Sequence, residues 1–110
     1  GKWKPLIEFL NSLHCDHLVL ELAHRPDDDL EALKELDPRL GIGLGVVDIK
    51  VNHVESADGI ARAIEKAETA LGGERVRYIN PDCGFWMLKR SVADRKIAAL
   101  AKGRDLYLGT

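Results

Sequence analysis

The sequence predicts an α/β fold with parallel strands, because helical and strand patterns alternate along its 110 residues. Two short apolar runs have the composition of strands covered on both faces, and a third strand is predicted after them. The three strands end near Glu21, Asp48 and Asn80, at intervals close to the roughly 30 residues of one strand and helix in a (β/α)8 barrel. We therefore expect residues 1–110 to form a single partial domain made of such βα units.

The first helix and strand are predicted from the apolar pattern near the start of the chain. Residues 5–13 place Leu, Ile and Phe side chains on one side of a helix, with Pro5 in its first turn. The short, mostly apolar run 17–22 predicts a strand buried on both faces. The acidic residues 27–29 suit the positive end of a helix dipole, so a second helix is expected there and ends at Asp37-Pro38.

The glycine-rich run 40–48 predicts a second buried strand. Gly41, Gly43 and Gly45 alternate with apolar residues, so the three glycines lie on one face and admit a close neighbour there. They lack the glycine spacing of a dinucleotide-binding fingerprint, and they lie within a strand rather than at a strand-to-helix turn. This argues against nucleotide binding.

The last part of the chain predicts two further helices around a third strand. Ser56 is expected to cap a helix whose apolar stripe ends before Gly72-Gly73. Residues 75–80 predict the strand, and a last helix is expected from about Val92 to Lys102, before Gly103. Three strands cannot close a barrel. The chain is therefore either the last part of a larger barrel, or it completes its sheet by association through an open edge.

Composition excludes several classes of protein. The 16 Lys and Arg residues interleave with 18 Asp and Glu residues, for a net charge of −2, so no basic patch for nucleic acid is expected. No apolar run approaches the roughly 20 residues that span a bilayer, and the first residues do not resemble a secretory signal. Two cysteines are too few for a disulfide framework. We expect a cytoplasmic protein without nucleic-acid or membrane partners.

Polar residues follow each predicted strand, at the edge where parallel α/β folds place their active groups. They are Glu21 and His24, Asp48 and Lys50, and Asn80, Asp82 and Cys83. A buried Glu21 needs a cation or hydrogen-bond donors, so a salt bridge to Arg25 or Lys50 is the structural alternative to a functional role. Asp48 and Lys50 are equally compatible with a simple ion pair, and His24 with an exposed loop residue.

Cys83 is the better metal-ligand or nucleophile candidate of the two cysteines. It lies between Asn80-Pro81-Asp82 and Gly84, in a turn beyond a strand rather than in a core. A thiolate and a carboxylate facing one pocket suit part of a zinc site, although no third protein ligand is evident. Cys15 lies at the other end of the first strand, about 20 Å away. We expect a structural role for its cluster, His14-Cys15-Asp16-His17.

Three segments together resemble the carboxyl-terminal part of the catalytic barrel of the cobalamin-independent methionine synthase family, including its shorter relatives. The segments are Ile42-Gly-Leu-Gly-Val-Val-Asp48, Val54-Glu55-Ser56 and Tyr78-Ile-Asn-Pro-Asp-Cys-Gly84. Asn-Pro-Asp-Cys-Gly is the specific element. The resemblance implies the last βα units of a (β/α)8 TIM barrel and a zinc ion held by His, Cys, Glu and Cys. It also implies methyl transfer from a donor to a homocysteine-like thiol.

The resemblance implies roles for individual residues. Glu21 matches the glutamate ligand and Cys83 the last cysteine ligand, while a His-x-Cys element upstream would complete the zinc site. Zinc would lower the pKa of the acceptor thiol, so that a thiolate persists near neutral pH. Asp48 and Lys50 would orient substrate or move a proton. From their position after the strands, and not from the resemblance, His24 and Asp82 are expected to contact substrate.

One position departs from the family pattern. Lys50 stands where the long methionine synthases have a catalytic histidine. Short relatives often have a similar sequence there, and they include enzymes with other methyl donors and epoxyalkane transferases that act on coenzyme M. The donor and the acceptor therefore stay open. Another zinc-dependent thiol alkyltransferase, or a barrel fragment without catalysis, remains an alternative to the methyltransferase.

Overall fold

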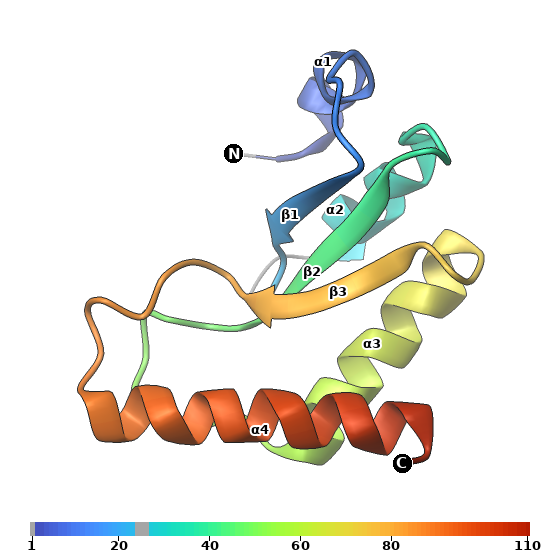
Figure 1. Ribbon diagram of the computed structural model, residues 1–110. Coiled ribbons are helices and arrows are strands. Elements are labelled where there is room, and N and C mark those ends of the chain that lie inside the picture. Colours follow the sequence, from blue (N-terminus) through green and yellow to red (C-terminus); the bar gives the residue numbers. More distant parts are fainter. Residues whose placement is uncertain (1, 24–26) are drawn as a thin grey trace.

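A computed structural model describes residues 2–23 and 27–110 and has a parallel sheet at its centre (Figure 1). The three strands are β1 (His17–Glu21), β2 (Gly41–Val47) and β3 (Val76–Pro81), in the order β1-β2-β3. The helices are α1 (Ile7–Asn11), α2 (Asp27–Ala32), α3 (Ala57–Leu71) and α4 (Arg90–Leu108), with short 3-10 turns η1 (Lys4–Leu6) and η2 (Leu33–Glu35). Both strand pairs are parallel, which confirms the predicted α/β class.

The helices pack on one face of the sheet. Ile42 and Leu44 of β2 point to this face and are almost completely buried. Ile42 belongs to an apolar cluster near α1 and η2, which includes Leu10, Leu33 and Leu40. Leu44 belongs to a second cluster, under α3 and α4. The core therefore lies between the sheet and its helices. On the other face of the sheet, within the part of the chain that the structure describes, the strands are covered only by their own side chains.

That other face of β2 consists of glycines. A methyl group on Gly43 would lie 3.0 Å from Val19 Cγ2 and 3.0 Å from Asn80 Oδ1. The glycines thus allow side chains of β1 and β3 to lie over the middle strand, so the predicted close neighbour is the protein itself. Val19 is 58% exposed. The prediction that β1 is buried on both faces was wrong, because the helices cover only one of them.

Helix α3 begins and ends as the sequence predicts. Ser56 Oγ accepts a hydrogen bond from the Gly59 amide at 3.0 Å, which satisfies a free donor of the first turn. Gly72 has a φ of 93°, the left-handed conformation that ends many helices and that glycine adopts without strain. The cap and the stop are therefore local features that can be read without tertiary structure.

Helix α4 is longer than predicted, because Gly103 does not end it. Gly103 is buried inside the helix, and a Cβ there would collide with the Ile60 side chain of α3. Glycine at this position lets the two helices approach closely. The prediction of a helix end at Gly103 was wrong because a packing requirement, not a local stop, selects the glycine.

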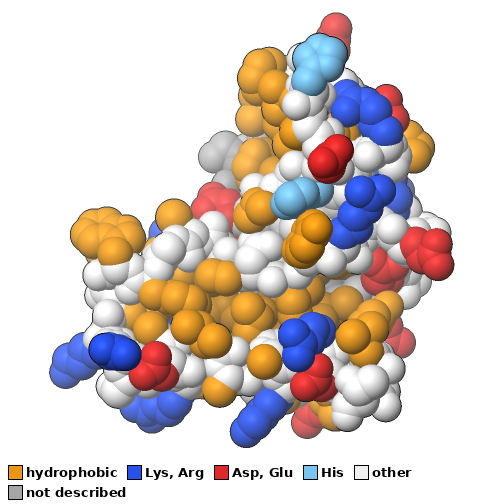
Figure 2. Space-filling view, viewed as in Figure 1, with side chains coloured by type: hydrophobic (Ala, Val, Ile, Leu, Met, Phe, Trp, Pro, Cys, Tyr) orange, Lys and Arg blue, Asp and Glu red, His pale blue; other side chains and the backbone are white. Residues whose placement is uncertain are grey.

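An apolar groove of about 400 Å³ separates the edge strand β3 from α4. Its lining includes Val76, Tyr78, Ile79, Ile97, Leu100 and Leu108. Figure 2 shows apolar side chains gathered between the sheet and the lower helix. Within the described residues no helix is long and apolar enough to cross a membrane.

Candidate functional site

The carboxyl ends of the three strands meet at one edge of the sheet. Glu21 pairs with Gly45, and Gly45 pairs with Asn80. The loops that follow β2 and β3 leave this edge together and run toward the first turn of α4 (Figure 1). The parallel arrangement therefore brings Glu21, Asp48 and the Asp82-Cys83 turn to the same edge, as the sequence predicts.

Asp82 ties the ends of all three strands together. Its Oδ1 accepts hydrogen bonds from the backbone amides of Leu22 and Ala23, each at 3.1 Å. Its own amide donates to the Val47 carbonyl at 2.9 Å. Two amide donors on one carboxylate oxygen make a strong, charge-assisted contact. Asp82 was predicted to contact substrate, and in the structure this oxygen braces β1 against β3.

Glu21 lies at the end of β1 on the glycine face of the sheet. Its neighbour Leu20 is buried in the core, so strand alternation turns Glu21 to the opposite face. The side chain is half-buried, and its backbone carbonyl accepts a hydrogen bond from Trp3 Nε1 at 3.4 Å. The amides that Asp82 holds follow Glu21 directly. The hydrogen bonds to Asp82, the residue before Cys83, therefore also fix the backbone directly after Glu21.

Both cysteines are free and exposed, but they lie at opposite ends of the sheet. Cys83 follows β3 at the carboxyl edge. Cys15 precedes β1 at the amino edge, and its carbonyl accepts a hydrogen bond from Arg39. The loop after Cys83 also exposes Trp86, whose side chain is 82% accessible. Position in the fold thus separates Cys83 from Cys15, as predicted.

Asp48 begins the loop that connects β2 to α3. Its Oδ1 accepts a hydrogen bond from the Lys50 amide at 2.8 Å, which closes a tight turn directly after the strand. The Lys50 residue itself is exposed. The contact between these two residues therefore joins the Asp48 carboxylate to the Lys50 backbone, which differs from the side-chain ion pair considered as the alternative.

Lys96 and Glu55, which form a pair near this edge, were not among the site residues predicted from sequence. Lys96 of α4 is completely buried, and its Nζ forms an ion pair with Glu55 Oε1 at 2.9 Å. The signal was its spacing, because the buried residues of α4 are Ala93, Lys96, Ala99 and Gly103. A lysine within the inward stripe of a helix calls for a buried partner.

The described residues alone do not form a complete metal site. None of their His, Cys, Asp and Glu side chains form a group of three or more that could hold an ion. A carboxylate (Glu21) and a free thiol (Cys83) lie at one edge, and this donor pair suits zinc. His24, the remaining candidate, lies outside the described residues. The chain therefore fits a zinc site that needs further ligands from elsewhere.

Comparison with known proteins gives a consistent family match. The family model described as "Cobalamin-independent synthase, Catalytic domain" matches residues 2–105. A methionine synthase of Thermococcus kodakarensis is 37% identical over 101 residues, which are 92% of this chain and 30% of that protein. A methionine synthase of Pyrococcus horikoshii is 34% identical over 92% of this chain and 29% of its own length. The chain thus spans about 30% of the relatives it matches.

A solved structure has the same fold. The B12-independent methionine synthase of Shewanella sp. W3-18-1, in complex with selenomethionine, matches with a TM-score of 0.80. The match covers 97% of this chain and 30% of that chain, at 21% sequence identity. The fold is therefore that of consecutive βα units of a TIM barrel, which confirms the predicted partial barrel.

Proposed function

Because the chain belongs to the cobalamin-independent synthase catalytic-domain family, we propose that it is the carboxyl-terminal part of a methyltransferase barrel. The complete protein would transfer a methyl group from a donor to a homocysteine-like thiol in the cytoplasm. The observation that carries this proposal is the placement of Glu21 and Cys83 at one sheet edge, with Asp82 bracing the backbone beside both.

Glu21 and Cys83 would be two of the ligands of a zinc ion, and other parts of the barrel would supply the rest. When bound, zinc lowers the pKa of a thiol, so that the acceptor reacts as a thiolate. The thiolate sulfur forms a bond to the methyl carbon while the bond from that carbon to the donor breaks. The electron pair of the broken bond stays on the donor, which then takes up a proton.

The other residues of the edge would bind substrate and move that proton. The half-buried carboxylate of Asp48, which the Lys50 amide holds in place, would orient substrate or transfer a proton. The exposed Lys50 would offer a positive charge to an anionic part of the donor or acceptor. His24 would contact substrate, as the sequence indicates. The Asp82 oxygen that accepts two amides acts as a brace, so any contact with substrate would involve its second oxygen.

The two cysteines provide a matched test in the protein that carries the complete barrel. We expect Cys83→Ser to lower both zinc content and methyl transfer to homocysteine by more than about 100-fold, because serine has no thiolate. Cys15→Ser, at the opposite end of β1, should change neither. Circular dichroism checks that both variants fold. Full zinc content and turnover in Cys83→Ser would refute the ligand assignment. Absence of turnover in the unmodified protein would favour the fragment without catalysis.

A further inference from the structure

We propose that Lys96 is a positioning residue which, together with Glu55, holds the loop after β2 so that Asp48 faces the carboxyl edge of the sheet. The proposal concerns residues 48–55, between β2 and α3. It rests on the proposed function only for the role of Asp48 toward substrate. The contacts themselves come from the loop and from α4.

Lys96 reaches the loop from the buried side of α4. Its ammonium group donates to the Asp48 carbonyl at 2.9 Å, to the His53 carbonyl at 2.6 Å and to Glu55 Oε1 at 2.9 Å. An ammonium has three donors, and each has an acceptor here. One buried side chain therefore binds the loop both at its start and near its end.

Glu55 provides the second half of this arrangement. While its Oε1 binds Lys96, its Oε2 accepts a hydrogen bond from the Asp48 amide at 2.8 Å. Both peptide groups of Asp48, the N–H and the C=O, are thus held by the Lys96–Glu55 pair. The carboxylate of Asp48 itself accepts the Lys50 amide in the turn that follows.

The energetics favour a role in loop geometry rather than in stability alone. Burying an ammonium and a carboxylate costs several kcal/mol of desolvation, and well-packed apolar residues often stabilise a fold as well or better. An apolar pair, however, has no donor for the two loop carbonyls and no acceptor for the Asp48 amide. The ion pair therefore specifies one loop conformation, which apolar packing cannot do.

Lys96→Met tests this arrangement in the chain as it is, without substrate or metal. Methionine keeps much of the length and apolar stem of lysine but lacks the three donors. The measurement is amide hydrogen exchange at Asp48, compared with an amide of the β2 ladder such as that of Leu44. We expect exchange at Asp48 to become at least about tenfold faster relative to Leu44, because the Asp48 carbonyl and Glu55, the acceptor of the Asp48 amide, both lose the ammonium group that holds them.

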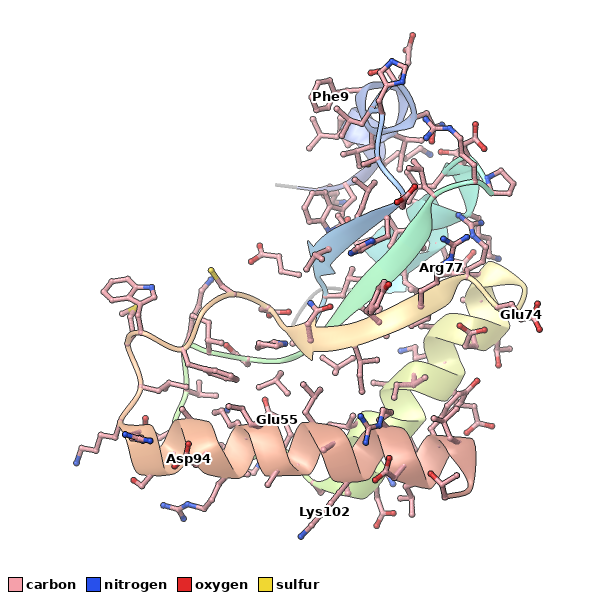
Figure 3. The ribbon with its side chains drawn as sticks, in the orientation of Figure 1. Phe9, Glu55, Glu74, Arg77, Asp94 and Lys102 are labelled. Carbon is pink, nitrogen blue, oxygen red and sulfur yellow. The ribbon has the colours of Figure 1, made fainter. Side chains whose placement is uncertain are left out.

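Lys102→Met is the matched control, because Lys102 lies on the same helix but is exposed and points away from the sheet and loop (Figure 3). It should leave both exchange rates unchanged. Glu55→Gln should act in the same direction as Lys96→Met, since one of its two terminal atoms becomes a donor that faces another donor. An unchanged Asp48 rate in Lys96→Met would overturn the proposal. So would an equal acceleration at Asp48 and Leu44, which indicates general loss of stability.

Turnover in the complete protein separates this inference from the proposed function. If Asp48 acts on substrate, Lys96→Met lowers kcat more than it changes KM, and adding Asp48→Asn lowers kcat little further, since both changes affect one group. Faster exchange at Asp48 with unchanged kcat would support the positioning by Lys96 and refute the role of Asp48 toward substrate.

Discussion

Asp82 Oδ1 lies directly over Gly45, at 2.5 Å from the point where a Cβ would stand. From there it accepts the amides of Leu22 and Ala23 on the far side of β2. The carboxylate that follows β3 reaches the two residues after β1 only because the strand between them has no side chain at this position. The glycine of the middle strand and the aspartate after β3 thus form one structural unit at the candidate site.

Gly45→Ala should therefore destabilise the chain by about 2–4 kcal/mol, the combined cost of overpacking and of lost charge-assisted hydrogen bonds. The new methyl group would also lie 2.7 Å from the Leu20 carbonyl, which is backbone and cannot move aside cheaply. Urea unfolding measures the change. Gly84→Ala is the control, because its nearest neighbour would be 3.9 Å away. Equal stability of the two variants would contradict the close packing of Asp82 on Gly45.

Asp82→Ala should cost about 1–3 kcal/mol, because the Leu22 and Ala23 amides lose their acceptor. Asp82→Asn keeps a carbonyl oxygen at the same place, so it should recover much of this loss. Urea unfolding of both variants tests the order. If asparagine were as destabilising as alanine, then charge rather than the shared acceptor geometry would explain the effect of Asp82.

Gly103→Ala is expected to destabilise the chain by about 1–3 kcal/mol, although alanine favours helices by about 1 kcal/mol over glycine. Tertiary packing outweighs propensity here, because the new Cβ would lie 2.6 Å from the Cβ of Ile60. Thermal unfolding followed by circular dichroism measures the result. A stabilised variant would mean that α3 and α4 separate without cost, which would contradict the close approach.

Much of the fold can be predicted from sequence because the strands are short segments bounded by turn residues, and the first two are mostly apolar. The runs 17–22, 40–48 and 75–80 contain or overlap His17–Glu21, Gly41–Val47 and Val76–Pro81. The first helix is less regular than expected, since residues 4–6 form a 3-10 turn before α1. Gly103 shows the limit of prediction from local sequence. Glycine is favoured both where a helix ends and where two helices approach closely, so the residue type alone does not distinguish the two cases.

The edge that carries the candidate site was also predictable, since parallel strands end together. The hydrogen bonds from the Leu22 and Ala23 amides to Asp82 could not be predicted, because they depend on the register of three strands. That register includes a shift between Gly45 and Val47, where β2 and β3 pair irregularly. Lys96 was missed for another reason. A charged residue in a helix suggests solvent exposure, and only its loop partners make burial favourable.

The groove beside β3 predicts self-association of the isolated chain. An open strand edge and an apolar groove favour contact with another strand or a second copy. Ile97→Lys should shift the chain toward monomer in light scattering at several concentrations, because Ile97 lines the groove and is 49% exposed. Leu106→Lys is the matched control, on the same helix and 53% exposed but outside the groove lining. A monomer before any substitution would contradict the prediction.

Zinc binding by the 110-residue chain should be weak, because Glu21 and Cys83 leave the rest of the coordination sphere to water. The two residues are expected to share one ion, and this gives the sharpest test. Glu21→Gln and Cys83→Ser should each weaken zinc binding in calorimetric titration. The double variant should bind little more weakly than either single variant, since removing one ligand already removes most of the site. Independent, additive losses would mean that the two side chains bind separate ions, and the shared site would then be refuted. Adding the other parts of the barrel should tighten binding strongly in the unmodified protein but not in Cys83→Ser, whose coordination set stays incomplete.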